Sequence, residues 1–487
     1  MTETSGSPAD QGTQGRATLQ KNCLPYPEVV AQSVAVIAPS TVPAAIIGLI
    51  FATAGNGTWL SFLLGMAGMM LIGGCINQFA RRSASPGSLY TYIVQGLGPT
   101  PGILGGWALM LGYILTGMST LCGFAIIADL LLKQWTGFSL GTVEWFVVGA
   151  GLTGYIASRN VRMSAKTMLF LEAVALLSVV TLGVLIWSYK GFALDPAQLK
   201  LEGASMSGVL LGVVLVVFGF SGFESSTSLG DEAKDPLRSI PRSVTQSVVV
   251  SGLFFIFSAY VVVFGFSGEA ADLGRTEAPL HHLSQRYGLD WLGTVINVGI
   301  LMSFFACTLA AINSTARILY SMSNHGLFFQ ALGEAHARNR TPHVAVFFSA
   351  LLTLALPVGA HLLGVSAFDA QGHFGTVASF GFIVVYILIA VAAPLYLRRI
   401  GQLTTGALLC SGGGLLFMAF PILGVIGDVF PLSGNVNALL LGVFALYMLA
   451  GFGWLRLERS RRPQMIDQVQ GAIEQVRLSF SAAGKPQ

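Results

Sequence analysis

Apolar runs of about twenty residues recur along nearly the whole chain, and they limit its fold more than any other feature. A helix of that length crosses the hydrocarbon core of a bilayer. Only 10% of the residues are charged and 53% are hydrophobic, whereas a soluble domain carries about 25% charged residues. The sequence therefore predicts an all-α membrane protein with twelve transmembrane helices, over residues 33–54, 57–79, 102–132, 143–156, 168–187, 207–228, 244–266, 292–322, 344–363, 376–397, 403–426 and 438–455.

The basic residues alternate between rich and poor loops if the N-terminus is placed in the cytoplasm. Of the 26 Lys and Arg, 21 then lie inside and five outside, namely Lys133, Lys190, Lys200, Arg275 and Arg286. Because basic residues concentrate in cytoplasmic loops, this distribution predicts a multi-pass protein of the cell membrane with both termini in the cytoplasm. The net charge of +4 reflects these loops and does not indicate nucleic-acid binding. The lipid bilayer is the expected partner.

The sixth run is interrupted near its centre. Residues 218–224 read Phe-Gly-Phe-Ser-Gly-Phe-Glu, and clustered glycines with a carboxylate are unexpected at mid-depth in a transmembrane helix. Within hydrocarbon every backbone group must be satisfied internally, so a broken helix persists only where it lines a cavity. An ionisable residue at that depth, here Glu224, is by default a functional-site hypothesis. The segment therefore indicates a solute site in the middle of the membrane.

The first run carries a second interruption. Pro39 and Pro43 each remove a backbone donor, and Ser40 and Thr41 between them can bond the freed backbone groups. Interruptions in corresponding positions five spans apart favour a transporter built from inverted repeats. Free N–H groups of one half-helix suit a carboxylate, and free carbonyls of the other suit an ammonium or a small cation. A zwitterion fits both, with Phe220 as a candidate apolar or cation–π wall. Simple helix kinking is the alternative.

Three motifs resemble those of the amino acid–polyamine–organocation family of permeases. The strongest reads Gly-Phe-Glu at 222–224, Gly-Asp-Glu-Ala-Lys-Asp-Pro at 230–236 and Ser-Ile-Pro-Arg at 239–242. A second, Ser-Pro-Gly-Ser-Leu-Tyr-Thr-Tyr, lies at 85–92, and a third lies between 314 and 342. The resemblance covers almost the whole chain. It implies the leucine-transporter fold, a 5+5 inverted repeat with broken helices 1 and 6 plus two extra helices, and alternating access around a site formed by spans 1, 3, 6, 8 and 10.

Carried over by position, the resemblance places the substrate against the two interruptions. The implied substrate-binding residues are Ala38, Pro39, Ser40, Thr41, Val42, Phe218, Gly219, Phe220, Ser221 and Gly222. Two features depart from the family pattern. Span 1 reads Ala-Pro-Ser-Thr-Val where many members have Gly-x-Gly-Ile, and the span 5 lysine of proton-coupled relatives is absent, its place falling at about Ala175. The binding geometry at span 1 and the coupling ion therefore stay open.

Two sets of side chains are candidates for ion coupling. Glu172 is a candidate proton carrier, because apolar surroundings disfavour the charged carboxylate, and a structural hydrogen bond to the backbone of span 1 or span 8 is the alternative. Ser303, Cys307 and Thr308 on span 8 would line a sodium site, or would satisfy neighbouring backbone. Exchange of one amine for another without an ion is the third hypothesis. The cysteine spacing indicates neither a disulfide framework nor a metal site, so no cofactor is expected beyond a coupling H⁺ or Na⁺.

Two further features are candidates for gating. We interpret Glu224 as a carboxylate that stabilises the N-terminus of the second half of span 6, with a contribution to gating. The polar segments 81–87 and 231–242 resemble an inner gate of the family, in which Asp231 or Glu232 would pair with Arg82 when the inside is closed. A solvated loop is the alternative.

The sequence predicts a secondary active transporter, not an enzyme, that moves an amino acid or related small amine across the cytoplasmic membrane. An exchanger without ion coupling is the main alternative. A channel would need a repeated selectivity motif, and a membrane enzyme would need clustered His, Asp or Cys at mid-depth. We divide the chain into an N-terminal segment (1–30, with 1–15 disordered), a transport core (31–400), two further spans (401–456) and a basic tail (457–487). Substrate identity, transport direction and oligomeric state are not specified by the residues.

Overall fold

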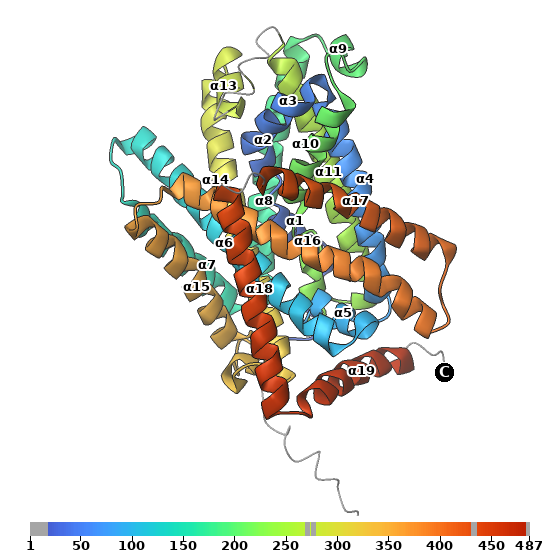
Figure 1. Cartoon of the computed structure of the whole chain (residues 1–487). Coiled ribbons are helices and arrows are strands. Elements are labelled where there is room, and N and C mark those ends of the chain that lie inside the picture. Colours follow the sequence, from blue (N-terminus) through green and yellow to red (C-terminus); the bar gives the residue numbers. More distant parts are fainter. Residues whose placement is uncertain (1–17, 268–272, 274–278, 430–435, 484–487) are drawn as a thin grey trace, which may run out of the picture.

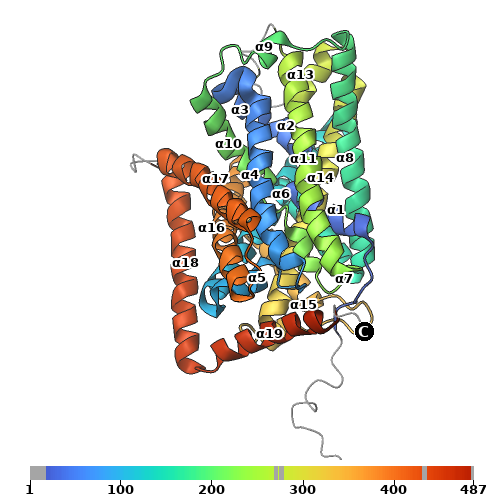
Figure 2. The ribbon, with the colours of Figure 1, turned by 90° about the vertical axis from the view of Figure 1, so that its right-hand side faces the viewer.

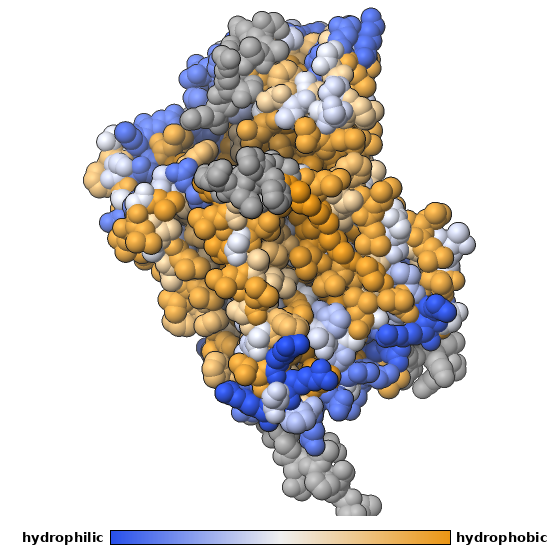
Figure 3. Space-filling model, in the orientation of Figure 1, coloured by the Kyte–Doolittle hydropathy of each residue, from blue (hydrophilic) through white to orange (hydrophobic). Residues whose placement is uncertain are grey.

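The computed structural model describes residues 18–267, 273, 279–429 and 436–483, which form a bundle of helices (Figure 1). The predicted disordered segment over residues 1–15 lies outside the described residues. Within them, eleven helical units are long and apolar enough to cross a membrane. On the face drawn in Figure 3, a broad apolar band separates two more polar ends. The prediction of an all-α, multi-pass membrane protein is confirmed.

The two ends of the bundle differ in what they carry (Figures 1 and 2). One end, which we call the α9 end, carries the short helices α9 (Pro196–Leu199) and α13 (Pro279–Arg286). The other, which we call the α5 end, carries α5 (Leu89–Leu97) and the C-terminal helix α19 (Met465–Ala483).

The first interruption divides one span into α1 (Tyr26–Ile37) and α2 (Thr41–Ala45), which α3 (Ile47–Ala54) continues. The helix stops because Ala38 is left-handed, with φ 47°, and because Pro39 has no N–H to donate. A new helix starts three residues later. The N–H and the hydroxyl of Thr41 both donate to the Ala38 carbonyl, at 3.0 and 2.8 Å.

The second interruption follows α10 (Met206–Phe220) and precedes the 3₁₀ helix η3 (Ser225–Leu229). Gly222 adopts φ 87°, and a Cβ there would lie 2.1 Å from Cγ1 of Val36, so both conformation and space require glycine. The two broken helices run in opposite directions. Their halves pair, because α10 packs on α3 and η3 packs on α1.

The long helix α6 (Pro99–Thr136) forms the centre of the bundle, between α14 (Asp290–Asn324) and α16 (Ala367–Arg399). Beside α1 and α14 lies α8 (Val161–Tyr189), and α11 (Pro236–Gly265) packs against α4 (Thr58–Ala80). The remaining elements are η2 (Gly55–Gly57), α7 (Thr142–Arg159), η4 (Gln330–Gly333), α15 (His343–Leu362), α17 (Thr405–Val429) and α18 (Val436–Arg461).

Two elements differ from the sequence-based expectation. The predicted fourth span is the helix α7, but α7 is not among the eleven described units that are apolar enough to span. The region expected to be a basic tail is largely helical, since α18 continues to Arg461 and α19 follows after a short turn. Figure 2 shows α19 lying across the α5 end.

Candidate functional site

A cavity of about 350 Å³ lies between the two interruptions. Its walls come from α1 to α3, α6, α10, α14 and α16. The volume falls in the range of small-molecule sites, about 300 to 1,000 Å³. The cavity extends to Leu49 on α3, whose side chain is 55% exposed, so it opens toward the α9 end. Among the described residues, no charged side chain lines it.

Six of the ten expected substrate-binding residues line this cavity, namely Ala38, Thr41, Val42, Phe218, Gly219 and Ser221. The other four, Pro39, Ser40, Phe220 and Gly222, do not line it. Phe220 is fully buried on the opposite side of α10, where its ring packs edge-on against Phe255 of α11 with centroids 5.1 Å apart. The aromatic wall of the cavity on this helix is therefore Phe218, contrary to the expectation for Phe220.

Two long helices complete the cavity with residues that the sequence did not single out. On α6 these are Thr116, Ser119 and Thr120, whose spacing of three and four places them on one helix face. That recurrence of hydroxyls within an apolar run was the available signal. On α16 the cavity is lined by Gln371, Gly372, Gly375, Thr376, Ala378, Ser379 and Phe382, and on α14 by Phe304 and Cys307.

Two tyrosines hold the carboxylate of Glu224, just past the second interruption. Tyr113 of α6 donates to Oε1 and Tyr386 of α16 donates to Oε2, each at 2.7 Å. The Tyr386 hydroxyl also accepts the N–H of Gly222 at 3.0 Å. The carboxylate makes no capping hydrogen bond to η3. Glu224 does occupy the N-cap position of η3, but its buried carboxylate bonds the two tyrosines and so joins α6 and α16 to the interruption.

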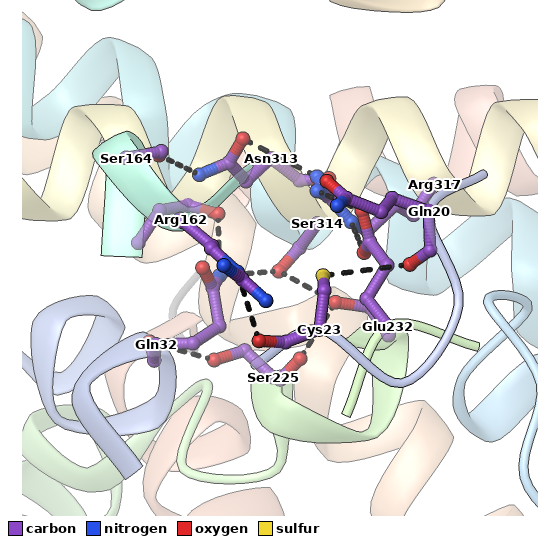
Figure 4. A network of polar contacts seen from close by, with 12 residues as sticks. Gln20, Cys23, Gln32, Arg162, Ser164, Ser225, Glu232, Asn313, Ser314 and Arg317 are labelled. Atoms are coloured by element: carbon purple, nitrogen blue, oxygen red, sulfur yellow. Dashed lines mark hydrogen bonds and ion pairs between the residues drawn. The ribbon is translucent and has the colours of Figure 1, made fainter. Parts of the chain in front are cut away.

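A buried polar network continues from Glu224 toward the α5 end, and Figure 4 shows part of it. The Ser225 hydroxyl donates to the backbone carbonyl of Gln32 at 3.0 Å. The side-chain amide of Gln32 donates to the Ser314 hydroxyl at 3.1 Å and to the Ala310 carbonyl at 2.9 Å. These bonds connect η3, α1 and α14, so the inner halves of both broken helices rest on the same long helix.

Arg317 and Glu232 form a buried ion pair farther along this network (Figure 4). Nε and Nη2 of Arg317 donate to the two carboxylate oxygens at 2.6 and 3.0 Å, and the side chains are 1% and 0% exposed. Nη1 donates to the backbone carbonyl of Asn313 at 3.0 Å and to its Oδ1 at 3.2 Å. Bidentate pairs of this kind combine two charge-assisted hydrogen bonds. The pair fastens α14 to the segment between η3 and α11.

The segment before α1 is paired to the same connection. The N–H groups of Cys23 and Leu24 both donate to the Glu232 carbonyl at 2.8 Å, and Lys234 N–H donates to the Leu24 carbonyl at 2.8 Å. Arg162 of α8 donates to the Cys23 carbonyl at 3.0 Å. We call residues 22–24 and 231–234 together the N-terminal clasp. With the clasp and the ion pair formed, the molecule is closed at the α5 end while its cavity opens toward the α9 end.

Arg82 takes no part in this closure, contrary to expectation. Its Nε and Nη2 donate to Oε1 of Gln402 at 3.1 and 2.9 Å, and within the described residues it forms no ion pair with Asp231 or Glu232. The reason is position, because Arg82 follows α4 and faces the connection between α16 and α17.

Burial raises the pKa of the Asp231 carboxyl, which lies outside the spans. Arg317 was not singled out from the sequence, although an arginine within an apolar run is an available signal of a functional residue.

The candidates for ion coupling make three separate contacts. The Ser303 hydroxyl donates to both carboxylate oxygens of Glu172, at 3.0 and 3.2 Å, so the partner of Glu172 is a side chain rather than backbone. The Cys307 thiol donates to a carbonyl in the last turn of α1 at 3.2 Å. The Thr308 hydroxyl lies 2.9 Å from that of Thr120. In the part of the chain that the structure describes, no cluster of three His, Cys, Asp or Glu could hold a metal ion.

The model of a family described as amino acid permease matches residues 28–448. That match includes both interruptions and every residue that lines the cavity.

Individual relatives are distant and differ in the solute that their names state. The cationic amino acid transporter 4 of Mus musculus is 24% identical over 69% of this chain, which spans only about half of that protein, 54%. The branched-chain amino acid permease BcaP of Bacillus subtilis is 23% identical, covering 69% of this chain and 74% of its own. The low-affinity putrescine importer PlaP of Escherichia coli is 26% identical, covering 63% and 67%. A solved Na⁺-coupled sialic acid symporter covers 83% of this chain and 91% of its own at 12% identity, with a TM-score of 0.49.

Proposed function

Because this chain belongs to the amino acid permease family, we propose that it is a secondary active transporter that moves a zwitterionic amino acid or related small amine by alternating access. The observation that carries the proposal is the cavity between the two interruptions. The substrate carboxylate would meet the N–H groups at the start of α2, and its ammonium would meet the carbonyls that end α1. The family and the named relatives are permeases rather than enzymes.

We further propose that the substrate side chain is uncharged. None of the described side chains that line the cavity is charged, and burying an unpaired charge is costly. Hydroxyls of Thr116, Ser119 and Thr120 and the rings of Phe218 and Phe304 surround the space instead. A small polar or aliphatic side chain fits that surface, whereas a second carboxylate or ammonium would find no counter-charge.

We propose that the α5 end faces the cytoplasm. Arg81, Arg82, Arg398 and Arg399 lie at the ends of helices that terminate there, and basic residues concentrate in cytoplasmic loops. In this orientation the cavity opens outward and the clasp closes the inside. The structure then corresponds to a state that exchanges substrate with the outside.

For coupling we favour a proton carried by Glu172. Its carboxylate is buried, and its hydrogen bonds within the described chain come from the single hydroxyl of Ser303, so a neutral carboxyl would still accept from that hydroxyl. Glu172→Gln should abolish accumulation driven by a proton gradient while substrate counterflow persists, and Ser303→Ala should weaken both only modestly. Gradient-driven accumulation by Glu172→Gln at the wild-type level, or strict dependence on Na⁺, would argue against a proton and favour the hydroxyl-lined sodium site.

The transport proposal can be tested with purified protein in proteoliposomes. Counterflow should be seen with neutral amino acids and not with lysine, glutamate or putrescine. Gly372 lines the cavity from α16, and nothing lies within 4 Å of a Cβ placed on it, so Gly372→Trp should block transport without disturbing the fold. Gly359→Trp on α15 is the matched control, because that position is equally open and lies away from the cavity. Equal activity of the two variants would exclude this cavity as the substrate site.

A further inference from the structure

A second cavity, of about 320 Å³, lies at the α5 end, between α19 and the rest of the bundle. It is lined by the end of α5, the end of α16 and the middle of α19, and it shares no residue with the cavity between the interruptions. Its polar lining includes the side chains of Tyr396, Arg399 and Gln470. It is therefore separate from the candidate substrate site.

The charges around this cavity do not cancel. On α19, Arg477 pairs with Glu474 at 2.9 Å. Arg399, at the end of α16, forms no ion pair with any described residue. The hydroxyl of Tyr396 and the amide of Gln470 also line the space without a hydrogen-bond partner in the described chain. One guanidinium and two neutral donors therefore face a cavity with a net positive charge, which suits a phosphate group.

The helix that covers the cavity is amphipathic. Met465, Val469 and Ile473 of α19 recur every fourth residue and are buried against the bundle, so α19 lies flat across the α5 end (Figure 2). Val94 and Ile400 add apolar surface inside the cavity. A phosphate-binding pocket with an aliphatic flank, at the border of the apolar band, matches the two parts of a phospholipid.

We propose that this cavity binds the headgroup of an anionic phospholipid, with Arg399 as the principal ligand for its phosphate. An inorganic phosphate shares that chemistry, but the position at the bilayer surface favours the lipid. A bound headgroup joins α19 to α16 and α5. Since Ser88, at the start of α5, hydrogen-bonds Thr227 of η3 at 2.5 Å, an occupied site also restrains the inner half of the second broken helix.

The test uses the full chain purified in detergent, with phosphatidylglycerol, phosphatidylcholine or inorganic phosphate added. Thermal shift and native mass spectrometry measure binding, so the result does not depend on the transported substrate. Phosphatidylglycerol should stabilise the wild type, and Arg399→Gln should weaken its apparent affinity about tenfold through the loss of charge-assisted bonds. Arg459→Gln removes the same charge from α18 away from the cavity and should leave the affinity unchanged.

A second pair of variants fills the space without changing charge. Gln470→Trp should abolish the response to phosphatidylglycerol, while Gln468→Trp, on an exposed position of α19 that does not line the cavity, should keep it. Equal responses of Arg399→Gln and Arg459→Gln, or an equal effect of phosphatidylcholine, would overturn the proposal. Stabilisation by inorganic phosphate to the same extent would overturn the assignment to a lipid and identify a free anion as the ligand.

Discussion

Tyr386 donates its hydroxyl proton to the Glu224 carboxylate at 2.7 Å, although the two residues lie 162 positions apart. The same oxygen accepts the N–H of Gly222 at 3.0 Å. One side chain of α16 therefore satisfies a backbone donor freed by the interruption and an acidic group just beyond it. In hydrocarbon such groups must be satisfied by protein, and this contact shows how the broken helix persists.

Tyr386→Phe keeps the ring and removes only that hydroxyl. We expect the free energy of unfolding to fall by about 1 to 3 kcal/mol, because a buried N–H and a carboxylate oxygen lose their partner. Substrate counterflow should fall as well, since the interruption is no longer held. Thermal unfolding of purified protein measures the first effect. Tyr155→Phe on an exposed position of α7 is the control, and equal stability of the two variants would contradict the role of Tyr386.

Gly222→Ala tests whether the interruption needs glycine for space as well as for its backbone angle. Gly222 and Gly364 adopt nearly the same φ, 87° and 88°, so alanine strains both by a similar amount. Only at Gly222 would the new Cβ meet a neighbour, Cγ1 of Val36 at 2.1 Å, because nothing lies within 4 Å of a Cβ at Gly364. We expect Gly222→Ala to lose substrate binding in a thermal-shift assay and Gly364→Ala to retain it. Retained binding by both variants would contradict the need for glycine at the contact between Gly222 and Val36.

The Arg317–Glu232 pair predicts strong non-additivity. Arg317→Met or Glu232→Gln alone should destabilise the protein by about 3 to 5 kcal/mol, because each leaves a buried polar partner uncompensated. The double variant should be less destabilised than the sum of the two, and thermal unfolding of all four proteins gives the coupling energy. The exposed pair of Arg238 and Asp235, 3.7 Å apart, is the control and should show little coupling. Strict additivity at the buried pair would rule out a direct interaction.

His325 predicts how stability depends on pH. Burial lowers the pKa of its imidazole to about 4, from an ordinary value of 6.5, and Nδ1 lies 3.0 Å from the Tyr90 hydroxyl. The folded protein therefore holds the neutral ring while the unfolded chain takes up a proton. The stabilising effect is present above pH 6.5 and is lost as the pH falls toward 4. His325→Gln should flatten the loss of thermal stability in that window, whereas His373→Gln on α16 should leave it steep.

Local pattern was sufficient to predict the two interruptions. Pro39 lacks a backbone donor just after the end of α1, and Gly222 takes the left-handed conformation just after the end of α10. The rotation of α10 about its axis was not predictable in this way. It is set by the packing of Phe220 on Phe255 of a later helix, and this contact turns Phe218 rather than Phe220 toward the cavity.

Partners distant in sequence account for the other differences. A carboxylate at a helix start is normally read as a cap, but Glu224 meets tyrosines supplied by α6 and α16. Arg82 was the expected partner of Glu232, but the folded positions of α4 and α14 place Arg317 there instead. Hydroxyls such as Thr116 satisfy helix backbone as readily as they line a site, so their spacing alone did not mark the cavity.

The N-terminal clasp has a consequence for how the protein is made. Its parallel bridge joins Leu24 to Ala233, so roughly 200 residues must leave the ribosome between the synthesis of one side and the other. At about 5 to 20 residues per second this takes on the order of 10 to 40 s. During that interval the first span is in the membrane without the partner that closes its inner end. Closure of the α5 end therefore follows the synthesis of the segment after η3 and cannot accompany insertion of the first span.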